Sequence, residues 1–233
     1  MALALAGASF DAVLDTNCYT GAQARSLIEA LGGRTPRAII ISSAAVYGDD
    51  AIQPADEDQP TGGATIWGAY GADKSAMEPV YRQAGFDHCA LLRPPYIFGP
   101  GNSGDRETWF WTRHLAGKPV LLPGDGQTQC QFIHVDDLAD LILTLTESAR
   151  HGLDMFNTAD PQSLSFAALS AMLSKVAGVA DHQVRVGDAA GNYAPRSWFP
   201  FRDHPCLTPP ARLMDALDWT PALPIERRFA DTF

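Results

Sequence analysis

The segment RAIIIS, residues 37–42, is the clearest indication of the fold class of this chain. It is a short, continuous apolar run, as expected for a β-strand buried on both faces of a parallel sheet. Similar apolar runs predict two more strands, at 10–15 (FDAVLD) and 87–93 (DHCALLR). Helical patterns lie between the three strands, at 20–33 and from about 67 to about 85. Strand, helix, strand, helix, strand is the order of a parallel sheet with crossover helices. The sequence therefore predicts an α/β fold.

Size and composition limit the classes of protein to consider. The chain has 233 residues, 46% of them hydrophobic, but no apolar run as long as the roughly 20 residues that a membrane helix needs. Its formal charge is −10, from 17 basic and 27 acidic residues, which argues against a nucleic-acid partner because such proteins usually present a basic face. The cysteines are scattered without a Cys-x-x-Cys pair, which argues against a metal site and suits a reducing cytosol: Cys18, Cys89, Cys130 and Cys206. We expect a cytoplasmic protein without a membrane or metal site.

One predicted helix holds a candidate acid/base pair, Tyr70 and Lys74. Residues four apart project from the same helix face. A free tyrosine, with a pKa of about 10, is a poor base at neutral pH, but a nearby ammonium lowers that pKa by favouring the phenolate. Such a phenolate can take a proton from an alcohol or return it to a carbonyl. The pair alone is a weak signal, because Tyr-x-x-x-Lys also occurs by chance on surface helices.

The ends of the predicted strands are where a ligand is expected, because parallel sheets bind ligands beyond their carboxyl ends. The segments to search follow residues 15, 42 and 93. Ser42 and Ser43 lie at the end of the central strand. Either hydroxyl can steady a substrate oxygen, or it can satisfy backbone groups where the strand ends. We favour the backbone role for Ser42 and the substrate role for Ser43.

Four motifs, in this order and at these spacings, resemble the extended short-chain dehydrogenase/reductase family, also called the NAD-dependent epimerase/dehydratase family: SSAAVYG (42–48), YGADK (70–74), LLRPPYIFGPG (91–101) and FIHVDDLAD (132–140). The resemblance implies that Tyr70 is the catalytic acid/base. It implies that Lys74 tunes Tyr70 and holds the nicotinamide ribose of NAD or NADP. It also implies that Ser43 binds the substrate oxygen.

The same resemblance extends to the domains and the ligand contacts. It implies a Rossmann-type sheet, truncated at its N-terminus, in residues 1–100, and a small mixed α/β substrate domain mainly in 101–233, from which some segments return to the sheet. The implied activity is hydride transfer on a sugar-like or other alcohol or carbonyl substrate. Tyr96 is expected to face this small molecule. Further contacts to the cofactor are expected from Thr16, Ser42, Tyr70, Pro94 and Pro95.

The start of the chain departs from the family pattern. The family begins with a strand, a Gly-rich turn and a helix that binds the dinucleotide pyrophosphate. We find no such opening here, so about 70 residues of that pattern are interpreted as missing. The literal Gly-x-Gly-x-x-Gly at 99–104 is rejected, because it lies beyond its strand and Pro100 lacks an amide that could face a phosphate. We therefore expect weak NAD or NADP binding, and an open sheet edge at 10–15 through which a homodimer can form.

Two other departures concern the reaction. Cys130 stands where the family's arginine grips the diphosphate of a nucleotide-sugar, which puts such a substrate in doubt. Ala44 and Ala45 stand where sugar dehydratases carry an Asp-Glu pair, which argues against dehydration. Three segments resemble a branch related to the chloroplast stem-loop RNA-binding proteins: 108–120, 198–206 and 215–221. The alternative is thus a non-catalytic RNA-binding or regulatory protein, or an inactive fragment of the enzyme.

Overall fold

The structure, a computed structural model, describes residues 8–102, 104–187 and 193–233. These residues form two compact units. The first unit holds the chain up to Pro95 together with Leu138–Ala159 and Thr208–Trp219. The second unit holds Tyr96–Asp137, Asp160–Leu207 and Thr220–Phe233. The chain therefore passes between the two units several times.

A four-stranded parallel sheet is the centre of the first unit. Its strand order is β1 (Val13–Asp15), β2 (Arg37–Ile41), β3 (His88–Arg93) and β8 (Gly152–Asn157). Apolar residues fill the middle of the two central strands, at 38–41 and 89–92, and every residue of β3 is buried. The α/β fold with a Rossmann-type parallel sheet, predicted from the sequence, is confirmed.

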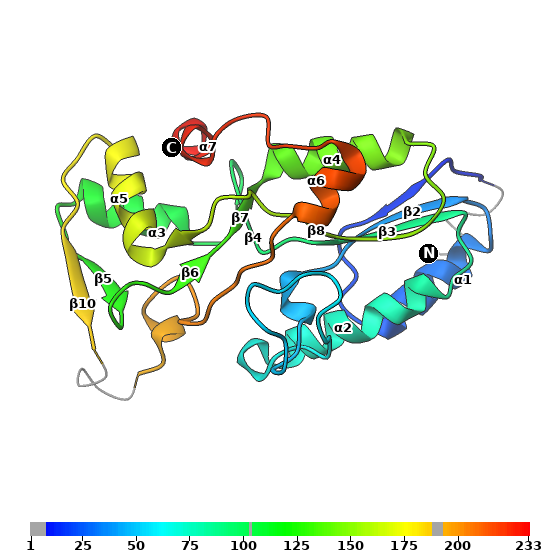
Figure 1. Ribbon diagram of the computed structural model, residues 1–233, viewed down its shortest axis with the longest axis horizontal. Coiled ribbons are helices and arrows are strands. Elements are labelled where there is room, and N and C mark those ends of the chain that lie inside the picture. Colours follow the sequence, from blue (N-terminus) through cyan, green and yellow to red (C-terminus); the bar gives the residue numbers. More distant parts are fainter. Residues whose placement is uncertain (1–7, 103, 188–192) are drawn as a thin grey trace. The chain divides into compact units, whose positions relative to one another are not determined.

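Helices cover both faces of this sheet. In Figure 1, α1 (Gly21–Leu31) and α2 (Ala69–Arg82) lie on one face, and α4 (Val135–Glu147) and α6 (Ala211–Leu217) lie on the other. The predicted start of α1 at Thr20 is confirmed, because the Thr20 side chain and the Gln23 side chain form a reciprocal capping box. The helix ends at Gly32, whose φ of 55° is left-handed.

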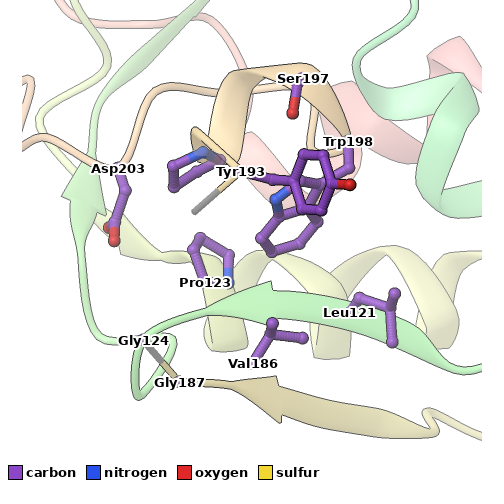
Figure 2. Close-up of a pocket in the computed structure, with 10 residues that line it drawn as sticks. Leu121, Pro123, Gly124, Val186, Gly187, Tyr193, Ser197, Trp198 and Asp203 are labelled. Atoms are coloured by element: carbon purple, nitrogen blue, oxygen red, sulfur yellow. The ribbon is translucent and has the colours of Figure 1, made fainter. Parts of the chain in front are cut away.

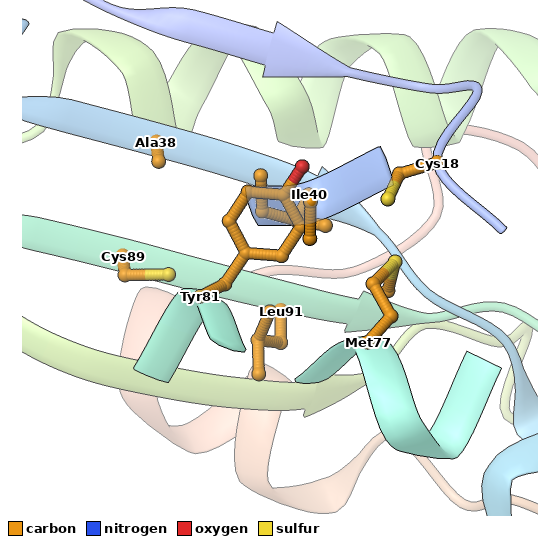
Figure 3. Close-up of a cluster of buried hydrophobic side chains, with 8 residues drawn as sticks. Cys18, Ala38, Ile40, Met77, Tyr81, Cys89 and Leu91 are labelled. Atoms are coloured by element: carbon orange, nitrogen blue, oxygen red, sulfur yellow. The ribbon is translucent and has the colours of Figure 1, made fainter. Parts of the chain in front are cut away.

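An apolar core fills the space between the sheet and the helices α1 and α2. Figure 3 shows Met77 and Tyr81 of α2 packed over Ile40 of β2 and Leu91 of β3, with Cys18 at one end of the cluster. All five side chains are at most 2% exposed. This packing fixes which face of α2 points toward the sheet and therefore where its polar residues lie.

The sheet differs from the sequence prediction in two features. The strand predicted at 10–15 is shorter, since only Val13–Asp15 pair with β2. Strand β8 was not predicted at all, although it pairs with β3 along its whole length. Its sequence, GLDMFN, carries Asp154 in the middle, which breaks the apolar run that identifies a buried strand. Asp154 is tolerated there because Arg150 and His88 bind its carboxylate.

The second unit is built from short strands, helices and an aromatic core. Its helices are α3 (Glu107–Leu115), α5 (Phe166–Val176) and α7 (Ile225–Thr232). Its strands form three pairs, β4 (Tyr96–Phe98) with β7 (Phe132–His134), β5 (Val120–Pro123) with β10 (Gln183–Val186), and β6 (Gln129–Cys130) with β9 (Leu164–Ser165). Phenylalanine rings pack together between these elements, for example Phe166 against Phe201 at 5.7 Å between centroids.

Candidate active site

The first turn of α2, which holds Tyr70, packs backbone to backbone on the turn that follows Ser43. That turn is a 3-10 helix, Ala44–Val46. A Cβ atom placed on Gly71 would lie 2.6 Å from the carbonyl oxygen of Ala45. A Cβ atom on Gly63 would lie 2.1 Å from the carbonyl carbon of Gly71. Only glycine permits this approach, and it brings the helix start that carries Tyr70 against the turn that carries Ser43.

The Lys74 side chain is buried and ends at the carboxyl ends of two strands. Its Nζ donates hydrogen bonds to the carbonyl oxygens of Cys18, at 2.7 Å, and of Ile41, at 2.8 Å. The residue is 3% exposed, and this burial lowers the pKa of Lys74, while the neighbouring Cys18, Asp15 and Glu78 act to raise it. The ammonium is thus fixed where the fold predicts a ligand, and one of its three N–H bonds is left for another acceptor.

Tyr70 lies one helical turn before Lys74 and is accessible. Its residue exposure is 42%. The ring of Tyr19 is 6.1 Å from the Tyr70 ring, centroid to centroid, and Nζ of Lys74 lies 5.0 Å from the Tyr19 centroid. Tyr70 and Lys74 therefore both lie beside Tyr19, which sequence analysis missed. The only sequence signal for Tyr19 is its place just after a strand end.

The hydroxyl of Ser43 caps the 3-10 turn. Its Oγ accepts a hydrogen bond from the backbone N–H of Ala45 at 3.1 Å, and Ser43 is largely buried. A hydroxyl oxygen that accepts a bond keeps its own hydrogen for donation. The capping bond therefore orients the hydroxyl without using the proton that a substrate oxygen would accept. Whether Ser43 binds substrate stays a prediction.

The Ser42 hydroxyl joins a buried charged network, whereas the sequence analysis had favoured a hydrogen bond to the backbone. Its Oγ donates to Oε1 of Glu78 at 2.6 Å. Arg93, which is 1% exposed, donates to both carboxylate oxygens of Glu78, at 2.9 and 2.7 Å, and also to the hydroxyl of Tyr47 and the carbonyl of Glu57. Sequence analysis missed Glu78, although it lies four residues after Lys74 on the same helix face. The predicted cofactor contact of Ser42 stays a prediction.

The other residues expected to bind the cofactor follow the ends of strands. Thr16 follows β1 and is exposed, and Pro95 is half-buried. Pro94 is buried and its carbonyl oxygen accepts the N–H of Ala44 at 2.9 Å, which ties the end of β3 to the Ser43 turn. Their contacts with a cofactor stay predictions.

The remaining predicted position, Tyr96, belongs to the second unit. Its ring packs against Phe201, with centroids 4.9 Å apart, and burial raises the pKa of Tyr96 well above its usual value. The predicted role of Tyr96 in substrate binding stays a prediction.

Cys130, where the family pattern has an arginine, lies in the core of the second unit. It is fully buried, and its backbone forms an isolated parallel β-bridge with that of Cys206. Burial raises the pKa of the Cys130 thiol. All four cysteines are free thiols. Among the residues that the structure describes, no group of three or more His, Cys, Asp or Glu side chains could hold a metal ion.

The second unit also contains a pocket that sequence analysis missed. Figure 2 shows Tyr193 and Trp198 facing Leu121, Pro123 and Val186 across a cavity of about 620 Å³. The lining is mostly apolar and aromatic, with the carboxylate of Asp203 at its edge. A cavity of this kind is typical of small-molecule sites. Residues far apart in sequence form it, so no local pattern announces it.

The polar strand ends, the glycine-packed turn and the Tyr70–Lys74 pair agree with a family match. Residues 4–159 match the model of the NAD dependent epimerase/dehydratase family. The chain belongs to that family. Chloroplast stem-loop binding protein of 41 kDa b from Arabidopsis thaliana is 27% identical over 230 residues, which cover 98% of this chain and 59% of that protein. UDP-glucose 4-epimerase from Mycolicibacterium smegmatis is 28% identical over 63% of this chain and 49% of that enzyme.

Solved structures show the same epimerase/dehydratase fold. A dTDP-glucose 4,6-dehydratase from Bacillus anthracis in complex with NAD superimposes with a TM-score of 0.75 at 16% identity, over 95% of this chain and 71% of that one. RMD from Pseudomonas aeruginosa complexed with NADPH gives a TM-score of 0.74 at 20% identity, over 98% and 82%. The chain spans about half the length of the first curated relatives it matches. None of its described helices is both long and apolar enough to cross a membrane.

Proposed function

We propose that this chain exchanges hydride between NAD or NADP and a sugar-like or other alcohol or carbonyl substrate, with Tyr70 as the acid/base. The observation that carries the proposal is the placement of Lys74. Its ammonium is fixed by two backbone carbonyls at the ends of β1 and β2, one helical turn from an exposed tyrosine. A fixed ammonium beside a tyrosine is the arrangement that lowers the pKa of a phenol.

The chain's own residues move and hold the proton. The positive charge of Lys74 favours the phenolate of Tyr70, which accepts the hydroxyl proton of an alcohol substrate or, in the reverse direction, protonates the oxygen of a carbonyl. The oriented hydroxyl of Ser43 donates a hydrogen bond to that same substrate oxygen. The nicotinamide, when bound, supplies the acceptor or donor of the hydride. Ala44 and Ala45 offer no acid or base, so we do not assign dehydration to this site.

The described residues fit the nicotinamide half of the cofactor. Lys74 keeps one N–H for a ribose hydroxyl, the exposed Thr16 follows β1, and the half-buried Pro95 follows β3. A Gly-rich turn between a first strand and helix, which would hold the pyrophosphate, is not found in the described ranges. Each charge-assisted hydrogen bond to a phosphate contributes about 1.5–3 kcal/mol. Calorimetric titration of NAD and NADP into the chain measures how strongly these residues bind the cofactor.

Turnover with and without the Tyr70 hydroxyl tests the proposal. The purified chain is incubated with millimolar NAD or NADP and a panel of sugars and nucleotide-sugars, and the absorbance of the reduced nicotinamide is followed. Tyr70→Phe removes only the hydroxyl and should lower the rate by about 10²- to 10⁴-fold. Glu29→Ala, a change at an exposed residue of α1 outside the candidate site, is the control. Equal rates for the chain and Tyr70→Phe would contradict the proposal.

A second candidate function, RNA binding, is favoured by one comparison. The relative that covers 98% of this chain is named a stem-loop binding protein. The charge of −10 opposes this function, because phosphate binding needs cations on the surface. Filter binding to a structured RNA at several salt concentrations separates the two. Affinity that falls steeply with salt and is the same in Tyr70→Phe would support the RNA-binding function.

A further inference from the structure

Tyr19 has a position that the acid/base assignment does not explain. It precedes α1, and its backbone N–H donates to Oε1 of Gln23 at 2.8 Å. Gln23 belongs to the capping box of α1, so the start of the helix holds the backbone of Tyr19 in place. The ring lies over Nζ of Lys74, at 5.0 Å from the centroid, and 6.1 Å from the ring of Tyr70. Tyr19 is 46% exposed, whereas Lys74 is 3% exposed. A half-exposed ring therefore covers a buried ammonium.

We propose that Tyr19 is a positioning residue for the Tyr70–Lys74 pair, acting as an aromatic cover that keeps water from the ammonium. Carbonyl oxygens of Cys18 and Ile41 hold two N–H bonds of Lys74 from the protein side. The ring of Tyr19 is a further contact of the ammonium, with its centroid 5.0 Å from Nζ. This inference rests on the proposed function for its catalytic meaning, but its physical content concerns only side chains of this chain.

Two effects of the ring act in the same direction. The face of an aromatic ring attracts a cation, and such contacts shift an equilibrium by about 2- to 30-fold. The ring also excludes water, and a charge acts more strongly on its neighbour where water is excluded, because the local dielectric constant is lower. The attraction of the ring holds the charged ammonium in place, and the lower dielectric constant strengthens the effect of that charge on the phenol of Tyr70. Losing them is expected to lower the acid dissociation constant of Tyr70 by about tenfold.

The other charged and titratable groups around the ammonium set the background. Burial lowers the pKa of Lys74, and Cys18, Asp15 and Glu78 oppose that shift. None of these three groups is altered by a change at Tyr19. A change in the acidity of Tyr70 in a Tyr19 variant therefore reports on the cover itself.

Tyrosinate absorbance measures the acidity of Tyr70 without substrate or cofactor. The pH titration of each protein is compared with that of the same protein carrying Tyr70→Phe, and the difference belongs to Tyr70. Burial raises the pKa of Tyr47 to about 12, and burial also raises the pKa of Tyr81 and of Tyr96, so these three ionise at high pH. Tyr19→Ala removes the cover, and Tyr19→Phe keeps the ring and is the matched control.

We expect Tyr19→Ala to lower the dissociation constant of Tyr70 about tenfold and Tyr19→Phe to change it less than about twofold. Tyr19→Leu keeps volume over the ammonium without the aromatic face, and should fall between the two. It also serves if Tyr19→Ala fails to fold, as circular dichroism will show. An unchanged dissociation constant in the folded Ala or Leu variant overturns the inference, and so does an equal loss in Tyr19→Phe.

The same variants separate this inference from the proposed function. If the chain shows no hydride exchange but Tyr19→Ala shifts the titration of Tyr70, the cover exists and the proposed function fails. If the chain turns over and the titration does not move, only the inference fails. Where turnover is measured, Tyr19→Ala should move the rise of kcat with pH to higher pH by the same factor as the titration, with KM little changed.

Discussion

Replacing Glu78 by alanine should destabilise the first unit strongly, because the change strands a buried guanidinium. Glu78 accepts two hydrogen bonds from Arg93, at 2.9 and 2.7 Å, and one from the Ser42 hydroxyl at 2.6 Å. Arg93 is 1% exposed, so water cannot replace the lost partner. Breaking a buried ion pair by removing one member costs about 3–5 kcal/mol. Arg93 keeps its bonds to Tyr47 and Glu57, which limits the loss, while the unsatisfied Ser42 hydroxyl adds to it.

Urea unfolding followed by far-ultraviolet circular dichroism measures this loss. With a slope of about 2–3 kcal/mol per molar urea, a loss of 3–5 kcal/mol moves the midpoint by about 1–2 M. Glu78→Gln keeps an oxygen for Ser42 and should lose about half as much. Glu29→Ala, at an exposed helical glutamate, is the control and should change the stability by no more than about 0.5 kcal/mol.

The double variant Glu78→Leu with Arg93→Met decides whether the stranded charge is the cause. It removes both charges and fills similar volume, so it should recover most of the stability lost in Glu78→Ala. The coupling between the two positions follows from a double-mutant cycle that includes Glu78→Leu and Arg93→Met as single variants. The reasoning is refuted if the double variant is no more stable than Glu78→Ala, or if Glu78→Ala unfolds at the same urea concentration as the parent chain.

Two further predictions follow from the packing and from burial. Gly71→Ala should lower the urea midpoint and the turnover rate, because its Cβ would lie 2.6 Å from the carbonyl oxygen of Ala45. Helix propensity alone would favour alanine by about 1 kcal/mol, so a rise in stability would contradict the close approach. His88 contacts Arg37 and Asp154, and burial lowers the pKa of its imidazole. The unfolded chain therefore binds the proton more readily than the folded chain. The free energy of unfolding should fall as pH drops below about 6.5, by at most about 1.4 kcal/mol per pH unit. His88→Gln should flatten that dependence between pH 7.5 and 5.5 in urea titrations, and identical curves for the two proteins would exclude His88 as the cause.

Elements whose signals lie within a few neighbouring residues could be predicted from the sequence. The apolar runs of β2 and β3 predict buried parallel strands because no polar residue interrupts them inside the sheet. The start of α1 at Thr20 is readable because a capping box spans only four residues. The shared helix face of Tyr70 and Lys74 follows from their spacing alone.

Which distant residues meet at the candidate site depends on the tertiary structure and could not be predicted from the sequence. Strand β8 escaped prediction because the polar Asp154 fits there only through partners on β3 and after α4, which its own sequence does not reveal. The acceptors of Lys74 are backbone carbonyls 56 and 33 residues away, and a carbonyl is the same in every residue, so no residue type marks them. The ring of Tyr19 reaches the ammonium of Lys74 because the register of the sheet and the packing of α1 against α2 fix the positions of the two segments that carry these residues. Such pairings depend on the three-dimensional path of the backbone, which local periodicity does not encode.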